Sequence, residues 1–93
     1  MSYSATSIKQ GARTYPGVKR VTTAENYRLI LEFDNEEKRV FDLTPLLKVG
    51  RFQTLVSPEL FNRVSVVFDT VEWENGLDLD PEYLYHKSIP LSQ

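Results

Sequence analysis

The sequence predicts a small α+β domain in which a mostly antiparallel sheet of about four or five strands carries short helices on one side, in the order β-β-β-α-β-β-α. Two observations lead to this class. Residues 27–33 and 38–43 alternate apolar and polar side chains with the period of two that is typical of half-buried strands. Proline directly follows Thr, Ser or Asp at positions 44–45, 57–58 and 80–81, which is the pattern of a helix start.

Length and composition indicate one globular domain. The chain has 93 residues, which suffices for a single modest core. It is 41% hydrophobic and 26% charged, as ordinary globular domains are. It has no cysteine, so disulfides and thiolate-bound metals are excluded. No apolar run is long enough for a signal peptide or a transmembrane helix, so we expect a cytoplasmic protein.

The chain divides into an arm, one domain and a tail. Residues 1–16 are polar and lack periodicity, so we expect a flexible N-terminal arm. The pattern of strands and helices occupies residues 17–88. Residues 89–93 contain Pro90 and are expected to form a C-terminal tail.

Three strands are predicted in the first half of the domain, at residues 18–23, 27–33 and 38–43. Four side chains of the second strand share the face expected to meet the core: Tyr27, Leu29, Leu31 and Phe33. The charged link 34–37 turns the chain between the second and third strands. Asn35 is its best candidate for a left-handed conformation, because a short amide side chain tolerates that conformation.

Short helices are expected in the middle of the chain. Thr44 is predicted to cap the first, and Gly50 is predicted to end it. Ser57 is predicted to cap the second, with Pro58 in its first position and Glu59 near its positive end. A helix of about two turns is too short to form alone, so packing must hold it.

A hairpin is predicted next. Residues 64–68 form a strand with Val64, Val66 and Phe68 on one face, and the chain turns at Asp69-Thr70. Trp73 is expected in the core. Asn75-Gly76 is the strongest turn signal of the chain.

The last helix follows this hairpin. Leu77 and Leu79 alternate with acidic residues and are expected to point inward. Asp80 is the expected N-cap and Pro81 the first helical residue. Leu84 is expected to be buried.

No catalytic set stands out. The single histidine, His86, is expected at the end of the last helix, without a nucleophile beside it. Asp78, Asp80 and Glu82 alternate as the first ligands of a calcium loop do. The glycine and the bidentate glutamate that such a loop needs at its sixth and twelfth positions are missing. We therefore predict no enzymatic activity, no metal and no cofactor, and an acid–base or metal site on these carboxylates is the least favoured alternative.

Charge is unevenly distributed. Residues 1–30 carry an excess of Lys and Arg, and residues 69–86 carry acids with no Lys or Arg. Such an asymmetry can steer a partner. The alternative function is nucleic-acid binding or autoregulation through the basic residues of the arm and the first strand: Lys9, Arg13, Lys19 and Arg20.

The leading interpretation is a non-enzymatic protein-interaction module. Exposed aromatic side chains ringed by acids fit a partner with a basic surface, and residues 73–88 combine the two types. The residues predicted to contact the partner are Glu74, Asp78, Tyr83 and Tyr85. The sequence leaves the oligomeric state open, although an edge strand can pair two copies into a dimer.

Two motifs resemble those of a known family. The more specific is the pattern Trp-x-Asn-Gly-x-Asp-Leu-x-Pro-x-x-Leu-Tyr at 73–85, and an aromatic-Asp-Leu-x-Pro-Leu-Leu piece at 41–47 supports it. On these motifs, residues 16–86 resemble the small bacterial family named domain of unknown function 2442. That family usually turns its first hairpin with Asn-Gly, where this chain has Glu36. The residues that would form its structural signature are Trp73, Asn75, Gly76, Asp80, Pro81 and Leu84.

The resemblance implies a small α+β domain without an assigned activity. Some members are fused to a DNA-binding helix-turn-helix, which this chain lacks. Many are encoded beside another small uncharacterised family, in pairs proposed to be toxin–antitoxin systems. The resemblance therefore implies an antitoxin-like partner of another small protein encoded nearby, an implication of association and not of chemistry.

Overall fold

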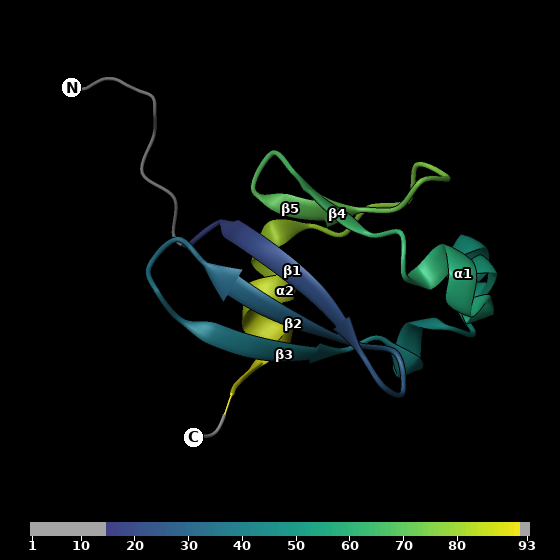
Figure 1. The fold of residues 1–93 in the computed structure, drawn as a ribbon, viewed down its shortest axis with the longest axis horizontal. Helices are drawn as coiled ribbons and strands as arrows, with labels where there is room; N and C mark the ends of the chain where they lie inside the picture. Colours follow the sequence, from purple (N-terminus) through teal and green to yellow (C-terminus); the bar gives the residue numbers. More distant parts are fainter. Residues whose placement is uncertain (1–14, 92–93) are drawn as a thin grey trace.

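The computed structural model describes residues 15–91 and contains a four-stranded sheet in the order β1-β2-β3-β6. Strands β1 (Val18–Ala24), β2 (Arg28–Phe33) and β3 (Lys38–Asp42) follow one another in the chain and form a meander (Figure 1). The last strand, β6 (Ile89–Pro90), returns to pair with β3. Each neighbouring pair is antiparallel.

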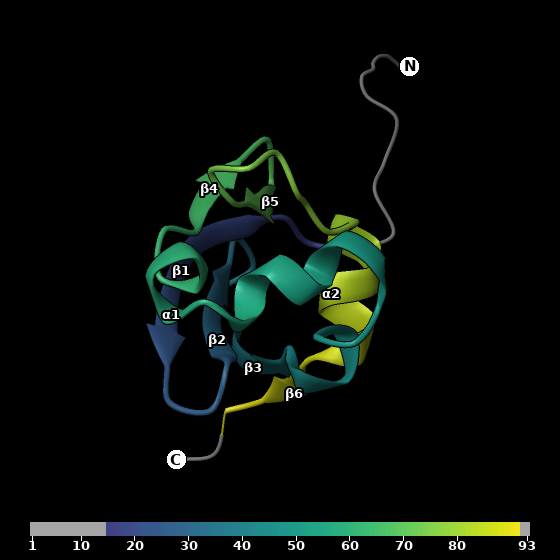
Figure 2. The same ribbon diagram turned by 90° about the vertical axis from the view of Figure 1, so that its right-hand side faces the viewer.

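The segment between β3 and β6 builds the rest of the domain. Two stretches of 3-10 helix, η1 (Thr44–Leu46) and η2 (Gly50–Val56), lead into the short helix α1 (Pro58–Phe61). A separate antiparallel hairpin follows, made of β4 (Ser65–Val67) and β5 (Thr70–Glu72). This hairpin lies along β1, at the edge of the main sheet (Figures 1 and 2).

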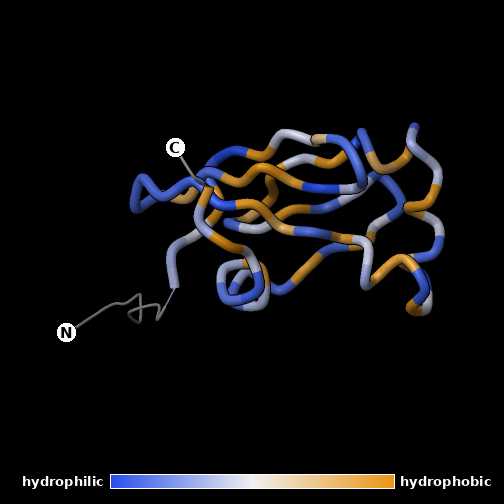
Figure 3. Tube along the Cα trace, turned by 90° about the horizontal axis from the view of Figure 1, so that it is seen from below, coloured by the Kyte–Doolittle hydropathy of each residue, from blue (hydrophilic) through white to orange (hydrophobic). Residues whose placement is uncertain are grey.

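Helix α2 (Pro81–Lys87) covers one face of the main sheet (Figures 1 and 2). Hydrophobic and hydrophilic residues alternate along the strands, which Figure 3 shows as changes of colour along the tube. Leu29, Leu31 and Phe33 share the covered face and are fully buried. Buried apolar side chains from every part of the fold complete the core: Val18, Phe41, Leu43, Leu55, Phe61, Val71, Trp73, Leu77, Leu79 and Leu84.

The predicted fold class is confirmed, and the structure adds a strand at its C-terminal end. The sequence places the end of the domain at residue 88. In the structure Ile89 pairs with Val40, and the N–H of Leu91 donates to the carbonyl of Lys38 at 2.9 Å. Proline is tolerated in β6 because the strand lies at the edge of the sheet, where a missing N–H is not needed.

Two turn predictions in residues 34–50 are wrong. The left-handed residue between β2 and β3 is Glu36, with φ 76°, and not Asn35. The side chain of Asn35 holds the turn instead, since its Oδ1 accepts from the N–H of Glu37 at 3.0 Å and its Nδ2 donates to the Glu37 carboxylate at 2.9 Å. Gly50, with φ 49°, begins η2 and does not end η1.

Of the two middle caps, one is as predicted. Ser57 caps α1, because its hydroxyl oxygen accepts from the N–H of Leu60 at 3.5 Å. Thr44 does not cap η1. Its N–H and its hydroxyl both donate to Oδ1 of Asp42, at 3.0 and 2.7 Å. These bonds, the backbone one first, hold the pKa of the Asp42 carboxyl below its ordinary value.

Tyr27 reaches the core from a turn and not from a strand. It precedes β2 and has φ 60°. Its ring makes an edge contact with Phe61, with centroids 5.2 Å apart, and its hydroxyl donates to the carbonyl of Val56. The inward direction predicted for this side chain is therefore right, while its backbone is not that of a strand.

Candidate functional site

The tip of the β4–β5 hairpin has an unusual backbone. Val67 pairs with Thr70, so Phe68 and Asp69 form a two-residue turn. Their φ angles are 50° and 73°. Two positive angles are characteristic of a type I′ turn, which matches the twist of the strands and favours Asn and Gly, because a larger side chain crowds the backbone there.

The Phe68 side chain lies almost wholly in solvent. It is 93% exposed, against 65% for Ile89 and 52% for Val49, the next most exposed large hydrophobic residues among those described. Tyr27 has the same left-handed backbone, but its ring packs on the core. The prediction that Phe68 shares a strand face with Val64 and Val66 is wrong, because β4 ends at Val67 and the turn begins one residue earlier than expected. A strained backbone with an exposed aromatic ring is typical of a binding site.

The hairpin that carries Phe68 is tied to the rest of the fold next to its turn. The N–H of Val18 donates to the carbonyl of Asp69 at 2.8 Å, which ties the turn to β1. The hydroxyl of Thr70 donates to the carbonyl of Leu79, and Val71 is fully buried. The ring of Phe68 is therefore presented on a fixed support, which lowers the entropy lost when it is bound.

The predicted signature residues serve the fold. Trp73 is 2% exposed, and its Nε1 donates to the carbonyl of Phe61 at 3.0 Å. Oδ1 of Asn75 accepts from the N–H of Leu77 at 3.2 Å, and Gly76 takes φ 90°. The Asn75-Gly76 turn signal is therefore correct, and the turn is closed by hydrogen bonds within the chain.

The start of α2 also matches the signature. Pro81 is the first helical residue, and Leu84 is fully buried. Asp80 stands at the N-cap with an extended backbone, and its side chain makes no capping hydrogen bond to the helix. Its carbonyl accepts from the N–H of Leu84 at 3.0 Å. Asp80 therefore contributes its backbone conformation and its carbonyl to the start of α2, and its carboxylate does not cap the helix.

Glu74 and Asp78, two of the predicted partner contacts, lie in the loop after β5. Glu74 forms an ion pair with Arg63 at 3.2 Å, and both side chains are more than half exposed. Asp78 is exposed and forms an isolated bridge with Glu72. Arg63 therefore offsets part of the acidic charge that the sequence concentrates in this stretch.

Tyr83 and Tyr85, the other two predicted contacts, lie on different sides of α2. Tyr83 is 36% exposed and makes an edge contact with Phe41, with centroids 6.0 Å apart. Tyr85 is half-buried and makes the equivalent contact with Phe33 at 5.2 Å. The four predicted contacts thus have different neighbours: Glu74 pairs with Arg63, whereas the two rings contact Phe41 and Phe33.

A polar cluster that sequence reasoning missed surrounds Tyr85. Its hydroxyl donates to Oε2 of Glu37 at 3.0 Å, and the Arg39 guanidinium lies 4.6 Å from the centre of its ring. Arg39 also donates to the carbonyl of Ser88 at 2.7 Å, which closes the end of α2. The hydrogen bond between Tyr85 and Glu37 lowers the pKa of Glu37 and raises the pKa of Tyr85. The cluster joins α2 to β3 and has a structural explanation.

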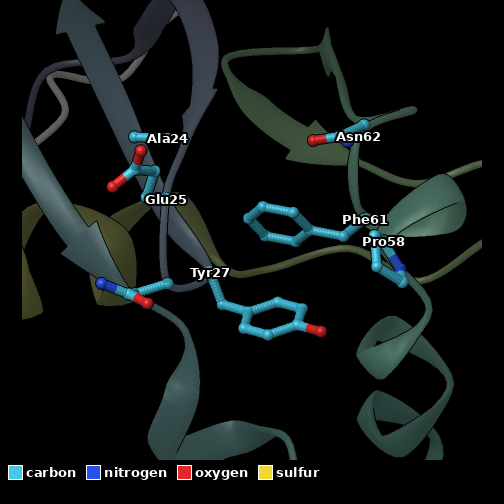
Figure 4. A pocket seen from close by; sticks show the side chains of 7 residues that line it. Ala24, Glu25, Tyr27, Pro58, Phe61 and Asn62 are labelled. Atoms are coloured by element: carbon cyan, nitrogen blue, oxygen red, sulfur yellow. The ribbon is translucent and has the colours of Figure 1, made fainter.

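A hollow of about 250 Å³ opens between the β1–β2 turn and α1 (Figure 4). The rings of Tyr27 and Phe61 form one part of its wall, and Glu25 supplies its carboxylate. The complete lining is Ala24, Glu25, Asn26, Tyr27, Pro58, Phe61 and Asn62. This set contains amides, rings and one carboxylate, and it pairs no nucleophile with a base.

The residues of the metal alternative are not gathered into a ligand set. Within residues 15–91, no three His, Asp or Glu side chains lie close enough to hold a metal ion. Nε2 of His86 lies 3.7 Å from Oε2 of Glu82, one turn earlier on α2.

Within residues 15–91, no helix is long and apolar enough to cross a membrane.

Comparison with known proteins identifies a family and no activity. A family model described as "Protein of unknown function (DUF2442)" matches residues 18–90. This range runs from the first residue of β1 to the last residue of β6, so it includes each helix and strand described above. No curated protein and no solved structure matches the chain. The resemblance inferred from the two motifs is confirmed.

Proposed function

The chain belongs to the family of proteins of unknown function DUF2442, and we propose that it acts as a non-enzymatic protein-interaction module anchored by Phe68. The observation that carries the proposal is the 93% exposure of this side chain on a left-handed turn. An aromatic ring that enters a pocket of a partner supplies much of the binding energy of an interface. In the free protein the same ring exposes apolar surface to water.

The chemistry of the partner follows from the ring and from the acidic stretch that begins beside it in the sequence. The partner needs an apolar pocket large enough for a phenyl group. It also needs basic groups at the border of that pocket, because residues 69–86 carry acids without Lys or Arg. The contacts predicted at Glu74 and Asp78 belong to this acidic stretch, but Glu74 lies beyond the end of the hairpin that is away from Phe68, because Val67 pairs with Thr70 and Ser65 with Glu72.

The antitoxin-like role implied by family resemblance is one form of this function. Its candidate partner is a small protein encoded nearby, as the family resemblance implies. Co-expression of the full chain with that protein, followed by size exclusion, tests the proposal. We expect one complex for the wild type and separate elution for Phe68→Asn, because Asn suits the turn but cannot fill an apolar pocket.

A matched control separates the anchor from general hydrophobicity. Val49→Thr removes another large exposed apolar side chain, 52% exposed, at the residue before η2. This variant is expected to co-elute with the partner as the wild type does. Two proteins that never co-elute contradict the proposal, and so does a complex that Phe68→Asn leaves intact.

Nucleic-acid binding through the basic residues stays a prediction. Lys9 and Arg13 lie outside the described residues. Lys19 and Arg20 are exposed on β1, and Nε of Arg20 donates to the Glu32 carboxylate at 3.0 Å. Binding to DNA that weakens steeply with salt and is lost when residues 1–16 are deleted would support this alternative.

A further inference from the structure

The face of the main sheet opposite α2 carries a row of one threonine and three aliphatic side chains, called the apolar row below. Thr22 pairs with Ile30, Ile30 pairs with Val40, and Val40 pairs with Ile89. Because side chains alternate along a strand, paired residues share a face, and this is the face that Leu29 and its companions do not use. The row therefore crosses all four strands at right angles to them. Ile89, at its end, is 65% exposed.

Charged residues border the apolar row on both sides. The pairing register gives one row of Arg20, Glu32 and Lys38, and on the other side a row of Ala24, Arg28 and Asp42. Two adjoining hollows of about 450 and 230 Å³ lie over this face, and Ile30 and Leu91 line both of them. Among residues 15–91, the helix packed on the main sheet lies on its other face (Figure 2).

We infer that this face binds a second copy of the chain, face to face, around a two-fold axis that runs along the apolar row. Such an axis reverses the strand direction and exchanges the two charged rows. Glu32 then faces Arg28 of the second copy, and Lys38 faces Asp42 of the second copy. Each pair occurs twice by symmetry, and the apolar row packs on itself.

The alternative orientation is unfavourable. A two-fold axis parallel to the strands and passing through β2 would keep each row opposite itself. Glu32 would then face Glu32, Arg28 would face Arg28, and Arg20 would face Lys38 of the second copy. Like charges held opposite one another destabilise a contact. The charge pattern thus selects one of the two ways in which the sheets can be aligned.

The interface has properties that can be measured. The apolar row is short, so we expect a weak dimer that forms as concentration rises. Exposed ion pairs at its border make the association sensitive to salt. Sedimentation equilibrium of the full chain at low salt should show a mass that rises from monomer to dimer with concentration, and the dimer should weaken at high salt.

Exchanging the charges of Glu32 and Arg28 tests how the two copies are oriented in the dimer. Glu32→Arg alone and Arg28→Glu alone each bring like charges together, so each should abolish the dimer. The double variant Glu32→Arg/Arg28→Glu restores opposite charges across the axis and should recover it. Glu82→Lys, a charge change on α2, is the control and should leave the dimer intact. Circular dichroism verifies that each variant is folded.

A second variant keeps the test independent of those charges. Ile30 lies in the middle of the apolar row, so Ile30→Lys would place two ammonium groups near the axis and should give a monomer. A wild type that is monomeric throughout the series overturns the inference, as does a dimer that survives Ile30→Lys or a folded double variant that stays monomeric. Phe68→Asn should leave the dimer unchanged, so this result does not depend on the proposed partner.

Discussion

The two turns on either side of β5 reverse the chain with different residues and different support. After β5, Gly76 takes φ 90° and Asn75 bonds the N–H of Leu77 at 3.2 Å and the hydroxyl of Thr54 at 3.0 Å. Before β5, Phe68 and Asp69 take φ 50° and 73° without a glycine. The first turn has the residues that its geometry favours, and the second has a bulky aromatic residue instead.

This difference separates residues that serve the fold from a residue that the fold does not explain. Trp73, beside the first turn, is buried and hydrogen-bonded. Phe68, at the second turn, is exposed and occupies a conformation that costs a phenylalanine about 1–2 kcal/mol. We propose that a contact made outside the monomer accounts for a phenylalanine at this position.

The largest effect is expected at the first turn, from Trp73→Ala. The side chain is 2% exposed, and its removal leaves a cavity and an unpaired carbonyl on Phe61. We expect a loss of about 3–5 kcal/mol in the free energy of unfolding, enough to unfold much of a small domain. Circular dichroism during urea unfolding measures this loss, because the signal does not depend on the tryptophan that the variant lacks. A loss below about 1 kcal/mol would contradict the role of Trp73 in the core.

The next largest loss of stability is expected from backbone strain at Gly76. A Cβ at this position meets no atom within 4 Å, so Gly76→Ala adds strain at φ 90° and no clash. We expect a loss of about 1–2 kcal/mol in urea unfolding. Gly50→Ala is the matched case, with equally open space but φ 49°, where residues with a Cβ are better tolerated. It should lose less, and an equal or larger loss would argue against strain as the cause.

At the second turn, the expected change in the free energy of unfolding has the opposite sign and is a gain. Phe68→Asn places a residue that tolerates the left-handed conformation and removes an exposed ring, so the free energy of unfolding should rise by about 0.5–1 kcal/mol. The shift in the urea midpoint measures it. A fall in stability would show that the phenyl ring serves the fold, and the contrast between the two turns would disappear.

The smallest effect is expected at the ion pair beside the first turn. Glu74→Gln removes the partner of Arg63, but both side chains are more than half exposed. Exposed pairs contribute about 0–1 kcal/mol, and salt screens them. We expect a change near the lower end of that range, measured by urea unfolding at low and high salt. A larger loss that salt does not reduce would assign Glu74 a role in the fold beyond this pair.

Local patterns predicted much of the fold, because they record burial directly. Alternation identified the covered face at Leu29, Leu31 and Phe33, and the Asn75-Gly76 signal identified its turn. The same alternation failed at Phe68. It continues through Val64 and Val66, and the period alone does not say where a strand ends.

The other errors arise from competition that no local pattern contains. Asn35 was expected in the left-handed position, but its side chain bonds Glu37 and leaves that conformation to Glu36. The contact between Tyr85 and Glu37 joins residues 48 positions apart. Its partners have no common signal in the sequence, and only the packing of α2 on β3 brings them together.

The account is tested most directly by measuring partner affinity and unfolding free energy on the single variant Phe68→Asn. Removal of a hot-spot aromatic residue costs about 2 kcal/mol or more of binding, so the affinity for the co-expressed partner should fall by about 30-fold or more. The unfolding free energy should rise by about 0.5–1 kcal/mol, as predicted above for this turn. Binding that is unchanged, or binding that is lost together with the fold, would contradict the claim that Phe68 is present for a partner.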